Sequence, residues 1–380
     1  MRPALKSVVW YRDQGDLVVV SGLDERVTFD DPDGMLEGLL GLLDDAGRTR
    51  EELVSECLRR WPAITAEDVS AALAGLDSLG LVADADVDDG LSSAQRERFF
   101  SNLVFFDGYA SLTRAGSHMQ ERLLDAHVVI LGVGGAGSSV MMNLVGLGVG
   151  RFTLLDSDVV EARNFVRQFA YHEHDLGRAK VDAAADWIEQ FNPSVSVRTV
   201  SRRIHGAHDI APLLCQCDLV IAAVDEPVDR IDVWINEACV SAGVPFVRGG
   251  ASRRQVRYWS VDPGRSACWA CNLHQRVPLA VDVARARGAE AGAVARFEGP
   301  NSSTGPASSL VGSLVSLEAM RYLTQFAPPA AAAVEHTMDL PTGRSETRSW
   351  QRWEGCPLCA RACRDQRSAA KPRATPATDA

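Results

Sequence analysis

The sequence predicts an α/β fold in which a doubly wound parallel sheet follows a small α+β domain. One observation is the stretch 127–150, HVVILGVGGAGSSVMMNLVGLGVG, where an apolar run, closely spaced glycines and a helical pattern follow one another. A second is the run 151–156, RFTLLD, a further strand that ends in an acidic residue. The third is the segment 1–85, where short strand patterns precede three helical patterns. The chain has 380 residues, enough for two domains.

Residues 1–85 are expected to form a winged-helix-like unit. Short apolar runs between turn residues predict strands, and apolar residues at helical spacing predict helices. The strands are expected at 7–11, 17–21 and 26–29, the helices at 35–43, 49–61 and 66–79, and a last strand from residue 81. Thr49 and Glu52 have the spacing of a capping box, which begins the second helix.

This unit resembles the PqqD-like peptide-recognition domains of ribosomal-peptide biosynthesis in the segments GRTREELV and DVSAALAGLDSLGLV. In that family, the leader of a precursor peptide adds a strand to the small sheet. Residues 1–90 carry 8 Lys and Arg against 20 Asp and Glu, a net charge of −12, whereas residues 91–380 carry 31 against 30. The acidity disfavours the alternative, DNA binding, and nucleic acid is not an expected partner. It would attract a basic peptide, although a solvated acidic surface explains it equally well.

The rest of the chain divides by composition. Residues 86–126 are interpreted as a linker and a helical segment, 127–363 as the main α/β domain, and 364–380 as a disordered tail. No apolar run reaches the roughly 18 residues of a membrane span, so no membrane association is expected. The N-terminus MRPALKSVVW lacks a signal-peptide core, and we expect a cytoplasmic protein.

The glycines of the main domain predict a nucleotide site. Gly132, Gly134 and Gly137 have GxGxxG spacing, with Gly135 as an extra glycine. Such glycines permit a sharp turn and bring backbone N–H groups to a phosphate at the start of the helix. Asp156, at the end of the next strand, is placed to bind a ribose hydroxyl. The alternative is a glycine turn that serves only close packing of the helix on the strand.

The segment after Asp156 decides which nucleotide is expected. It contains D-x-D at 156–158, N-x-x-R-Q at 164–168 and G-x-x-K at 177–180. Together these motifs resemble the ThiF/MoeB-type adenylyltransferases, relatives of the ubiquitin-activating enzymes, over about residues 95–363. An NAD-dependent oxidoreductase, the alternative for a lone glycine loop, needs none of these polar residues. An enzyme that cleaves a triphosphate needs cations to neutralise the developing charge.

The resemblance implies a role for each polar residue. Asp156 would hold the ribose, Asn164 and Arg167 the phosphates, and Lys180 the α-phosphate of ATP. Asp225 ends the strand DLVIAAVD, where the family has an aspartate that binds Mg²⁺ or the reacting end of the substrate. Catalysis would rest on Arg167, Lys180 and Asp225. The other nucleotide contacts would come from Asp158, Gln168 and the glycines 132, 134, 135 and 137.

Two CxxC pairs predict a structural zinc site. Cys268 and Cys271 form one pair, and Cys356 and Cys359 form the other. Each pair offers two thiolates to one ion, so that two pairs complete a tetrahedral site. Their long separation matches the family, whose members often carry zinc joining these two regions. The alternative is two unrelated thiol pairs. The cysteines of LLCQCDL, at 215 and 217, lack this spacing and are interpreted as buried thiols.

Three further features concern the reaction. Arg253 and Arg257 are expected on one face of a strand, and Arg254 on the opposite face. Together with Arg248 they form a basic patch, which is either solvated or substrate-binding. The segment 272–305, in the place of the family's crossover loop, contains no cysteine, so transfer to an enzyme thiol is not expected. Ser101, in Arg98-Phe-Phe-Ser101-Asn102, stands where the family has an arginine that reaches the partner subunit of a homodimer. Arg98, or an arginine at 96 or 114, could replace it.

We therefore expect ATP- and Mg²⁺-dependent adenylylation of a carboxylate on a ribosomally made precursor peptide. The two-part layout is most similar to the MccB-type peptide-modifying enzymes. One alternative is activation of the C-terminus of a ubiquitin-like sulfur-carrier protein, although the acidic first domain counts against it. Another is a non-catalytic scaffold that delivers a leader peptide to a partner enzyme.

Overall fold

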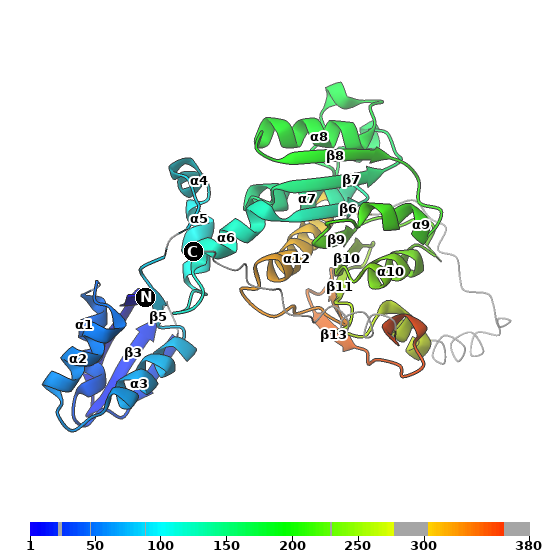
Figure 1. Cartoon of the computed structure of the whole chain (residues 1–380). Helices are drawn as coiled ribbons and strands as arrows, with labels where there is room; N and C mark the ends of the chain where they lie inside the picture. The colour runs from blue at the N-terminus through cyan, green and yellow to red at the C-terminus, as the bar shows by residue number, and fades with distance from the viewer. Residues whose placement is uncertain (22–24, 46, 88, 229, 277–302, 361–380) are drawn as a thin grey trace, which may run out of the picture. The chain divides into compact units, whose positions relative to one another are not determined.

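The computed structural model describes all residues except 22–24, 46, 88, 229, 277–302 and 361–380. The predicted disordered tail and most of the predicted crossover-loop segment 272–305 therefore lie outside the described residues. The chain divides into two compact units, Met1–Arg122 and Leu123–Ala380. The colour in Figure 1 runs from blue at the N-terminus to red at the C-terminus, and the two units are described separately below.

The first unit contains a three-stranded antiparallel sheet in the order β2-β3-β4 and three helices that cover one face of it. These elements are β2 (Val8–Asp13), β3 (Asp16–Ser21), β4 (Glu25–Phe29), α1 (Met35–Asp44), α2 (Arg50–Arg60) and α3 (Ala66–Ser78). The side chains of Leu17 and Val19 on β3 pack with leucines of the helices in a common core. The predicted strands and helices of this unit are thus confirmed.

One pairing in the first unit was not predicted. The strand β1 (Pro3–Leu5) pairs antiparallel with β5 (Val82–Asp84), the strand expected from residue 81. This pairing joins the first residues of the chain to the strand that follows α3. The predicted capping box is also present, because Glu52 N donates to Thr49 Oγ1 and Thr49 N donates to the Glu52 carboxylate. The rest of this unit holds α4 (Ser93–Arg98), α5 (Phe100–Asp107) and the start of α6 (Gly116–Asp125), which confirm a helical segment.

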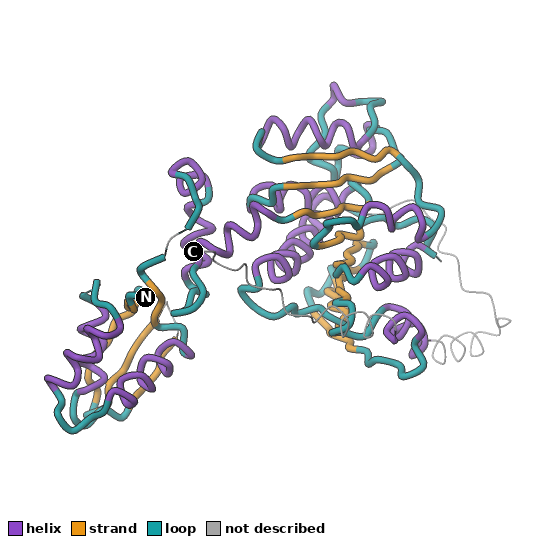
Figure 2. Tube along the Cα trace, in the orientation of Figure 1, coloured by secondary structure: helices purple, strands orange, loops and turns teal. Residues whose placement is uncertain are grey.

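The second unit is built on an eight-stranded sheet in the order β13-β12-β11-β10-β9-β6-β7-β8. The neighbouring strands β8, β7, β6, β9 and β10 run parallel to one another. The strands β11, β12 and β13 extend the sheet beyond β10, each antiparallel to its neighbour. Their bounds are β6 (His127–Leu131), β7 (Arg151–Asp156), β8 (Ser196–Ser201), β9 (Leu219–Ala222), β10 (Phe246–Ala251), β11 (Gln255–Val261), β12 (Val334–Asp339) and β13 (Ser345–Ser349). Figure 2 shows these strands as one layer between helices. The predicted doubly wound α/β fold is confirmed.

Helices cover both faces of this sheet (Figure 1). A Cβ on Gly249 of β10 would meet Val311 and Val315, which belong to α12 (Gly305–Thr324). Its neighbour Arg248 instead reaches Asp232 on α10 (Ile231–Ala242). Because successive strand residues point to opposite faces, α12 and α10 lie on opposite sides. The remaining helices are α7 (Gly135–Leu147), which packs on α12, α8 (Lys180–Phe191) and α9 (Ala207–Ile210). Among the described residues, no helix is long and apolar enough to cross a membrane.

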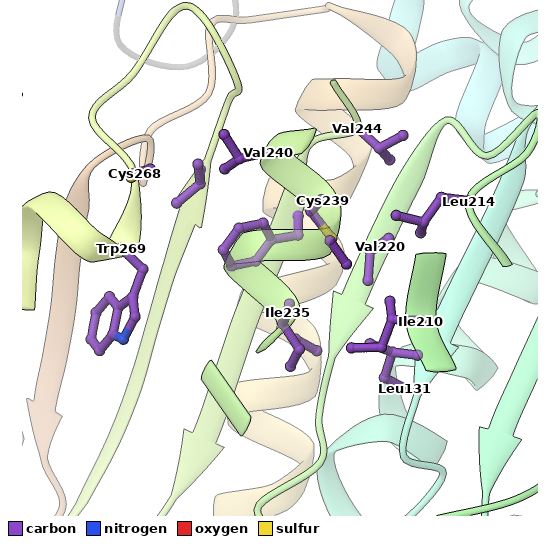
Figure 3. Close-up of a cluster of buried hydrophobic side chains, with 14 of the residues drawn as sticks. Leu131, Ile210, Leu214, Val220, Ile235, Cys239, Val240, Val244, Cys268 and Trp269 are labelled. Carbon is purple, nitrogen blue, oxygen red and sulfur yellow. The ribbon is translucent and has the colours of Figure 1, made fainter. Parts of the chain in front are cut away.

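The core explains why the strands are so apolar. Every residue of β9 is buried, and so are the last four of β6, because helices cover both faces. Figure 3 shows Ile235 and Cys239 of α10 beside Val220 of β9, within a cluster that extends to Trp269. The core thereby holds the carboxyl ends of β6 and β9 side by side.

Candidate functional site

The candidate site lies where the strand order reverses. The chain leaves β6 toward β7 and β8 and then returns to β9 on the other side of β6. In an open α/β sheet this reversal leaves a crevice at the carboxyl ends of the strands, where ligands bind. Ala223, just after β9, donates its N–H to the carbonyl of Leu131 at 2.8 Å. The glycine loop after β6 and the segment 223–225 after β9 are therefore neighbours.

Two glycines are required by close approach. Gly132 has φ of +89°, and a Cβ on it would lie 2.9 Å from the carbonyl carbon of Ala223. A Cβ on Gly137 would lie 1.8 Å from the carbonyl oxygen of Gly132. Gly134 is the N-cap of α7, and no side chain caps the first turn there. The first N–H groups of α7 are thus available to an anion such as a phosphate.

Asp156 ends β7 and closes this loop. Its Oδ2 accepts the N–H of Val133 at 2.9 Å, and its Oδ1 accepts the N–H of Asp158 at 2.9 Å. Burial raises the pKa of the Asp156 carboxyl, a change that nearby Lys180 and the two N–H donors oppose. Each carboxylate oxygen keeps a lone pair for a second donor, so the group can still bind a ribose hydroxyl.

Asp158 and Lys180 are brought together although they are far apart in the sequence. Lys180 begins α8, is 5% exposed, and donates its Nζ to Asp158 Oδ2 at 2.7 Å. Their backbones are also joined, since Lys180 N donates to the Asp158 carbonyl at 3.0 Å. The side chain of Asp158 is 65% exposed. The buried ammonium group is thus held by an exposed carboxylate, a partner that a phosphate could replace.

The segment 164–168 lies over the start of α7. A Cβ on Gly135 would lie 3.3 Å from Cγ of Arg167, and one on Gly134 would lie 3.8 Å from Nε2 of Gln168. Gln168 is buried, and its Oε1 has no partner among the described residues. Asn164 is also buried, and its Oδ1 accepts the N–H of Glu161 at 2.9 Å. Asn164 therefore stabilises its own turn, whereas Arg167 and Gln168 face the glycine loop.

Arg167 also borders a cavity. This cavity has a volume of about 470 Å³ and lies against α7 and α12. Its wall includes four serines, at 138, 139, 309 and 313, and the ring of Phe169. Arg167 thus lies between the glycine loop and a cavity whose wall combines hydroxyl groups with the apolar side chains of Met142, Leu147 and Phe169.

Asp225 lies three residues after β9, with its side chain 64% exposed. Its partner is Arg248 of β10, whose Nη2 lies 3.5 Å from Asp225 Oδ1. Arg248 is buried and also donates its Nε to Asp232 Oδ1 at 2.8 Å. Mg²⁺ in nucleotide sites is held by one or two carboxylates together with substrate phosphates, and an exposed carboxylate at this strand end fits that use. The sequence predicted Arg248 to be part of a basic patch, either solvated or substrate-binding, and did not indicate its burial or its pairing with Asp232. An arginine within the apolar run PFVRGG was nevertheless a signal of burial.

The predicted basic patch is only partly correct. Arg253 and Arg254 lie in the turn between β10 and β11, not in a strand, so they do not alternate across a sheet. The Nε of Arg254 lies 2.7 Å from Asp339 Oδ2 on β12. Arg257 and Arg248 both lie over the ring of Trp259, at 5.8 and 5.9 Å from its centroid. The antiparallel hairpin, which the sequence pattern did not predict, causes this difference.

The four cysteines of the CxxC pairs form one buried cluster. The Sγ–Sγ distances are 3.9 Å for Cys268–Cys271, 3.6 Å for Cys268–Cys356 and 3.6 Å for Cys271–Cys359. Zn–S bonds of about 2.3 Å in a tetrahedron place sulfur atoms about 3.8 Å apart, and a disulfide would need about 2.05 Å. All four ligand atoms lie within 4.8 Å of one another, so the donor set fits zinc.

The other predicted thiol pair differs from expectation. Cys215 is exposed, so its prediction as a buried thiol is wrong, because the turn before β9 directs it outward. Cys217 is half-buried, and burial raises its pKa to about 12.

Comparison with known proteins identifies the second unit. The family model described as the ThiF family matches residues 107–358. The chain belongs to the ThiF family. It is 30% identical over 242 residues to molybdopterin-synthase adenylyltransferase of Escherichia coli, a match that covers 63% of this chain and 89% of the relative. It is 29% identical over 181 residues to the SAMP-activating enzyme E1 of Haloferax volcanii, covering 48% of this chain and 63% of the relative.

Solved structures extend the likeness to nearly the whole ThiF-family chain. Escherichia coli MccB, in a crystal structure with AMPCPP and MccA, superimposes with a TM-score of 0.70. The match covers 94% of this chain and 100% of MccB at 18% identity. PaaA superimposes with a TM-score of 0.60 at 22% identity, covering 74% of this chain and 92% of PaaA. At these identities the likeness concerns the fold.

The family membership establishes the class of reaction. The chain is an ATP-dependent adenylyltransferase that acts on a carboxylate, as predicted. The non-catalytic scaffold and the NAD-dependent oxidoreductase are therefore set aside.

Proposed function

We propose that this enzyme adenylates a carboxylate on a ribosomally made precursor peptide, in peptide natural-product biosynthesis. The observation that carries the proposal is the first unit. The match to molybdopterin-synthase adenylyltransferase covers 63% of the chain, and the family model begins at residue 107. MccB, called a microcin C7 biosynthetic enzyme in a complex with N-formylated MccA, matches 94% of the chain. The first unit is thus a feature that accompanies the MccB-like fold.

The first unit has the surface that peptide capture needs. Its sheet ends at β2 and β4, whose outer edges are unpaired among the described strands. An extended peptide can satisfy the free N–H and C=O groups of such an edge. Val9 and Tyr11 on β2 are 67% and 45% exposed and offer apolar contacts there. The net charge of −12 over residues 1–90 favours a leader with Lys or Arg.

The second unit would carry out the transfer. A carboxylate oxygen of the peptide attacks the α-phosphorus of ATP, the bond from that phosphorus to the bridging oxygen breaks, and pyrophosphate leaves. Asp156 would bind the ribose, and Arg167 and Lys180 would neutralise the charge that develops on the phosphates. Mg²⁺, when bound, would neutralise the leaving pyrophosphate, and Asp225 is the carboxylate that would hold it. Catalysis would come from positioning and charge, without an acyl-enzyme.

We also propose one structural zinc per chain, bound by Cys268, Cys271, Cys356 and Cys359. It would join the segment after β11 to the segment after β13, which lie far apart in sequence.

A homodimer is proposed from the family resemblance. In the first unit Arg96 is ion-paired with Asp89, so in that state it is not available to replace the arginine missing at Ser101.

A second candidate is activation of a sulfur-carrier protein. Its support is the 30% identity with molybdopterin-synthase adenylyltransferase across 89% of that enzyme's length. The catalytic unit alone does not separate the two substrates, because both reactions begin with a carboxylate.

Exchange of labelled pyrophosphate into ATP separates the two candidates. The purified chain with Mg²⁺ is given either a candidate precursor peptide, sought among short reading frames near its gene, or a ubiquitin-like sulfur carrier. Exchange that depends on the peptide supports the proposal. Exchange that depends on the carrier alone transfers the assignment to the second candidate.

A further inference from the structure

Arg248 is a buried guanidinium that links three parts of the site. Its Nε donates to Asp232 Oδ1 of α10 at 2.8 Å. Its Nη1 donates to the carbonyls of Ala222 and Gly249, each at 3.1 Å. Its Nη2 faces Asp225 Oδ1 at 3.5 Å. The same side chain therefore contacts the end of β9, the start of α10 and the largely exposed carboxylate of Asp225.

The two carboxylates are held unequally. Burying an unpaired guanidinium is strongly unfavourable, so at least one carboxylate must accompany it. Asp232, with its side chain 22% exposed, makes the short bond, whereas Asp225, 64% exposed, lies at the limit of hydrogen bonding. Asp232 thus suffices to balance the charge of Arg248. The guanidinium of Arg248 therefore orients the Asp225 carboxylate without forming a short ion pair with it.

We propose that Arg248 is a positioning residue that orients the Asp225 carboxylate. Asp232 pairs with Arg248, so that Arg248 does not neutralise the Asp225 carboxylate. This inference rests on the proposed role of Asp225 as the Mg²⁺-binding carboxylate of the adenylation site. Asp232 accepts the short hydrogen bond from Arg248 and balances its charge, so that the carboxylate of Asp225 stays available for a cation. The arrangement makes a distinctive prediction, because removing the charge of Asp232 should weaken Mg²⁺ binding at a different carboxylate, that of Asp225.

The variants separate positioning from folding. Asp232→Asn keeps the shape of the side chain and removes the balancing charge, so Arg248 should pair closely with Asp225. Arg248→Met removes the directing group, and the double variant Arg248→Met/Asp232→Leu removes both buried charges without leaving one unpaired. Arg248→Lys keeps the charge. Arg257→Met is the matched control, because Arg257 lies over the same Trp259 ring at 5.8 Å but on β11.

The primary measurement is calorimetric titration of MgCl2 into each full-length protein saturated with AMPCPP. We expect the Mg²⁺ dissociation constant to rise about tenfold in Asp232→Asn, and to rise in Arg248→Met and the double variant, with Arg248→Lys in between. Arg257→Met should bind Mg²⁺ like the unchanged protein. Unchanged Mg²⁺ affinity in folded Asp232→Asn and in the double variant would overturn the inference.

Pyrophosphate exchange as a function of MgCl2 is the second readout. A shift to higher MgCl2 with recovery at saturation indicates positioning, whereas equal loss at every concentration indicates a merely structural role and overturns the inference. Failure of the proposed substrate is recognised separately. In that case the unchanged protein shows no exchange with the peptide, while the differences in Mg²⁺ binding between the variants persist.

Discussion

Lys180 and Asp158 form an ion pair of 2.7 Å between Nζ and Oδ2, with the lysine buried and the aspartate exposed. A buried ammonium needs a partner, and the short bridge between Val159 and Ala179 holds this partner in place. A nucleotide phosphate that approaches the crevice could take over the role of Asp158. The ion pair therefore holds the ammonium group of Lys180 beside Asp158, where a phosphate could bind to it.

Replacement of Lys180 should abolish the reaction and leave the fold intact. Lys180→Ala removes the cation proposed for the α-phosphate, and we expect pyrophosphate exchange to fall by about 100- to 1,000-fold. Asp225→Ala should abolish exchange likewise. Arg163→Ala is the control, since Arg163 is ion-paired with Glu161 and its side chain is 80% exposed. Normal exchange by a folded Lys180→Ala protein would contradict the role.

Two glycines of α7 should respond oppositely to alanine. Gly137→Ala places a Cβ 1.8 Å from the Gly132 carbonyl oxygen, so the turn must move and ATP binding should be lost. A Cβ on Gly146 of the same helix meets nothing within 4 Å. Gly146→Ala should therefore raise the free energy of unfolding by up to about 1 kcal/mol. Chemical denaturation and calorimetry with AMPCPP measure both effects; equal behaviour of the two variants would refute the packing argument.

Metal analysis should find one zinc ion per chain. Cys356→Ser removes one of the four thiolates, and both the zinc content and the melting temperature should fall, because metal-binding energy contributes to folding. Cys215→Ser, at an exposed cysteine outside the cluster, should change neither. Protein prepared without chelators that contains no zinc, or a disulfide within either pair, would reject the site.

Alkylation of the neighbouring cysteines should depend on pH in different ways. Burial raises the pKa of the Cys217 thiol to about 12. Only the thiolate reacts, and at pH 8 a thiol with that pKa is ionised to about one part in ten thousand. In native protein, iodoacetamide should therefore modify Cys215 at pH 8 and Cys217 only as the pH rises well above 10. Mass spectrometry of peptides measures both sites, and equal rates at pH 8 would contradict the burial of Cys217.

The features predicted correctly from the sequence are mostly local. The glycine turn before α7, the strand that ends at Asp156 and the capping box at Thr49 each depend on residues close together in the chain, so their spacing carries the information. The four-cysteine cluster is the long-range exception, since two CxxC pairs are recognisable in the sequence and one tetrahedral ion would need both of them.

The features missed depend on contacts that spacing does not encode. The pairing of β1 with β5 joins residues about eighty positions apart. The turn at Arg253 depends on the hairpin of β10 and β11, and β12 and β13 are polar strands with little periodic signal. The burial of Arg248 follows from α10 packing beside β10, and the sequence order gives no indication of Asp232 as its partner.

The most direct test of the account compares two substrates with and without residues 1–85. If residues 1–85 of the first unit capture the leader, tethering raises the effective concentration of the reacting carboxylate, and the deletion should raise KM for the full-length precursor by about 100-fold. The turnover of a leaderless peptide should hardly change, because that peptide makes no use of the first unit. A truncated enzyme that stays folded and modifies the full-length precursor with unchanged KM would contradict peptide capture.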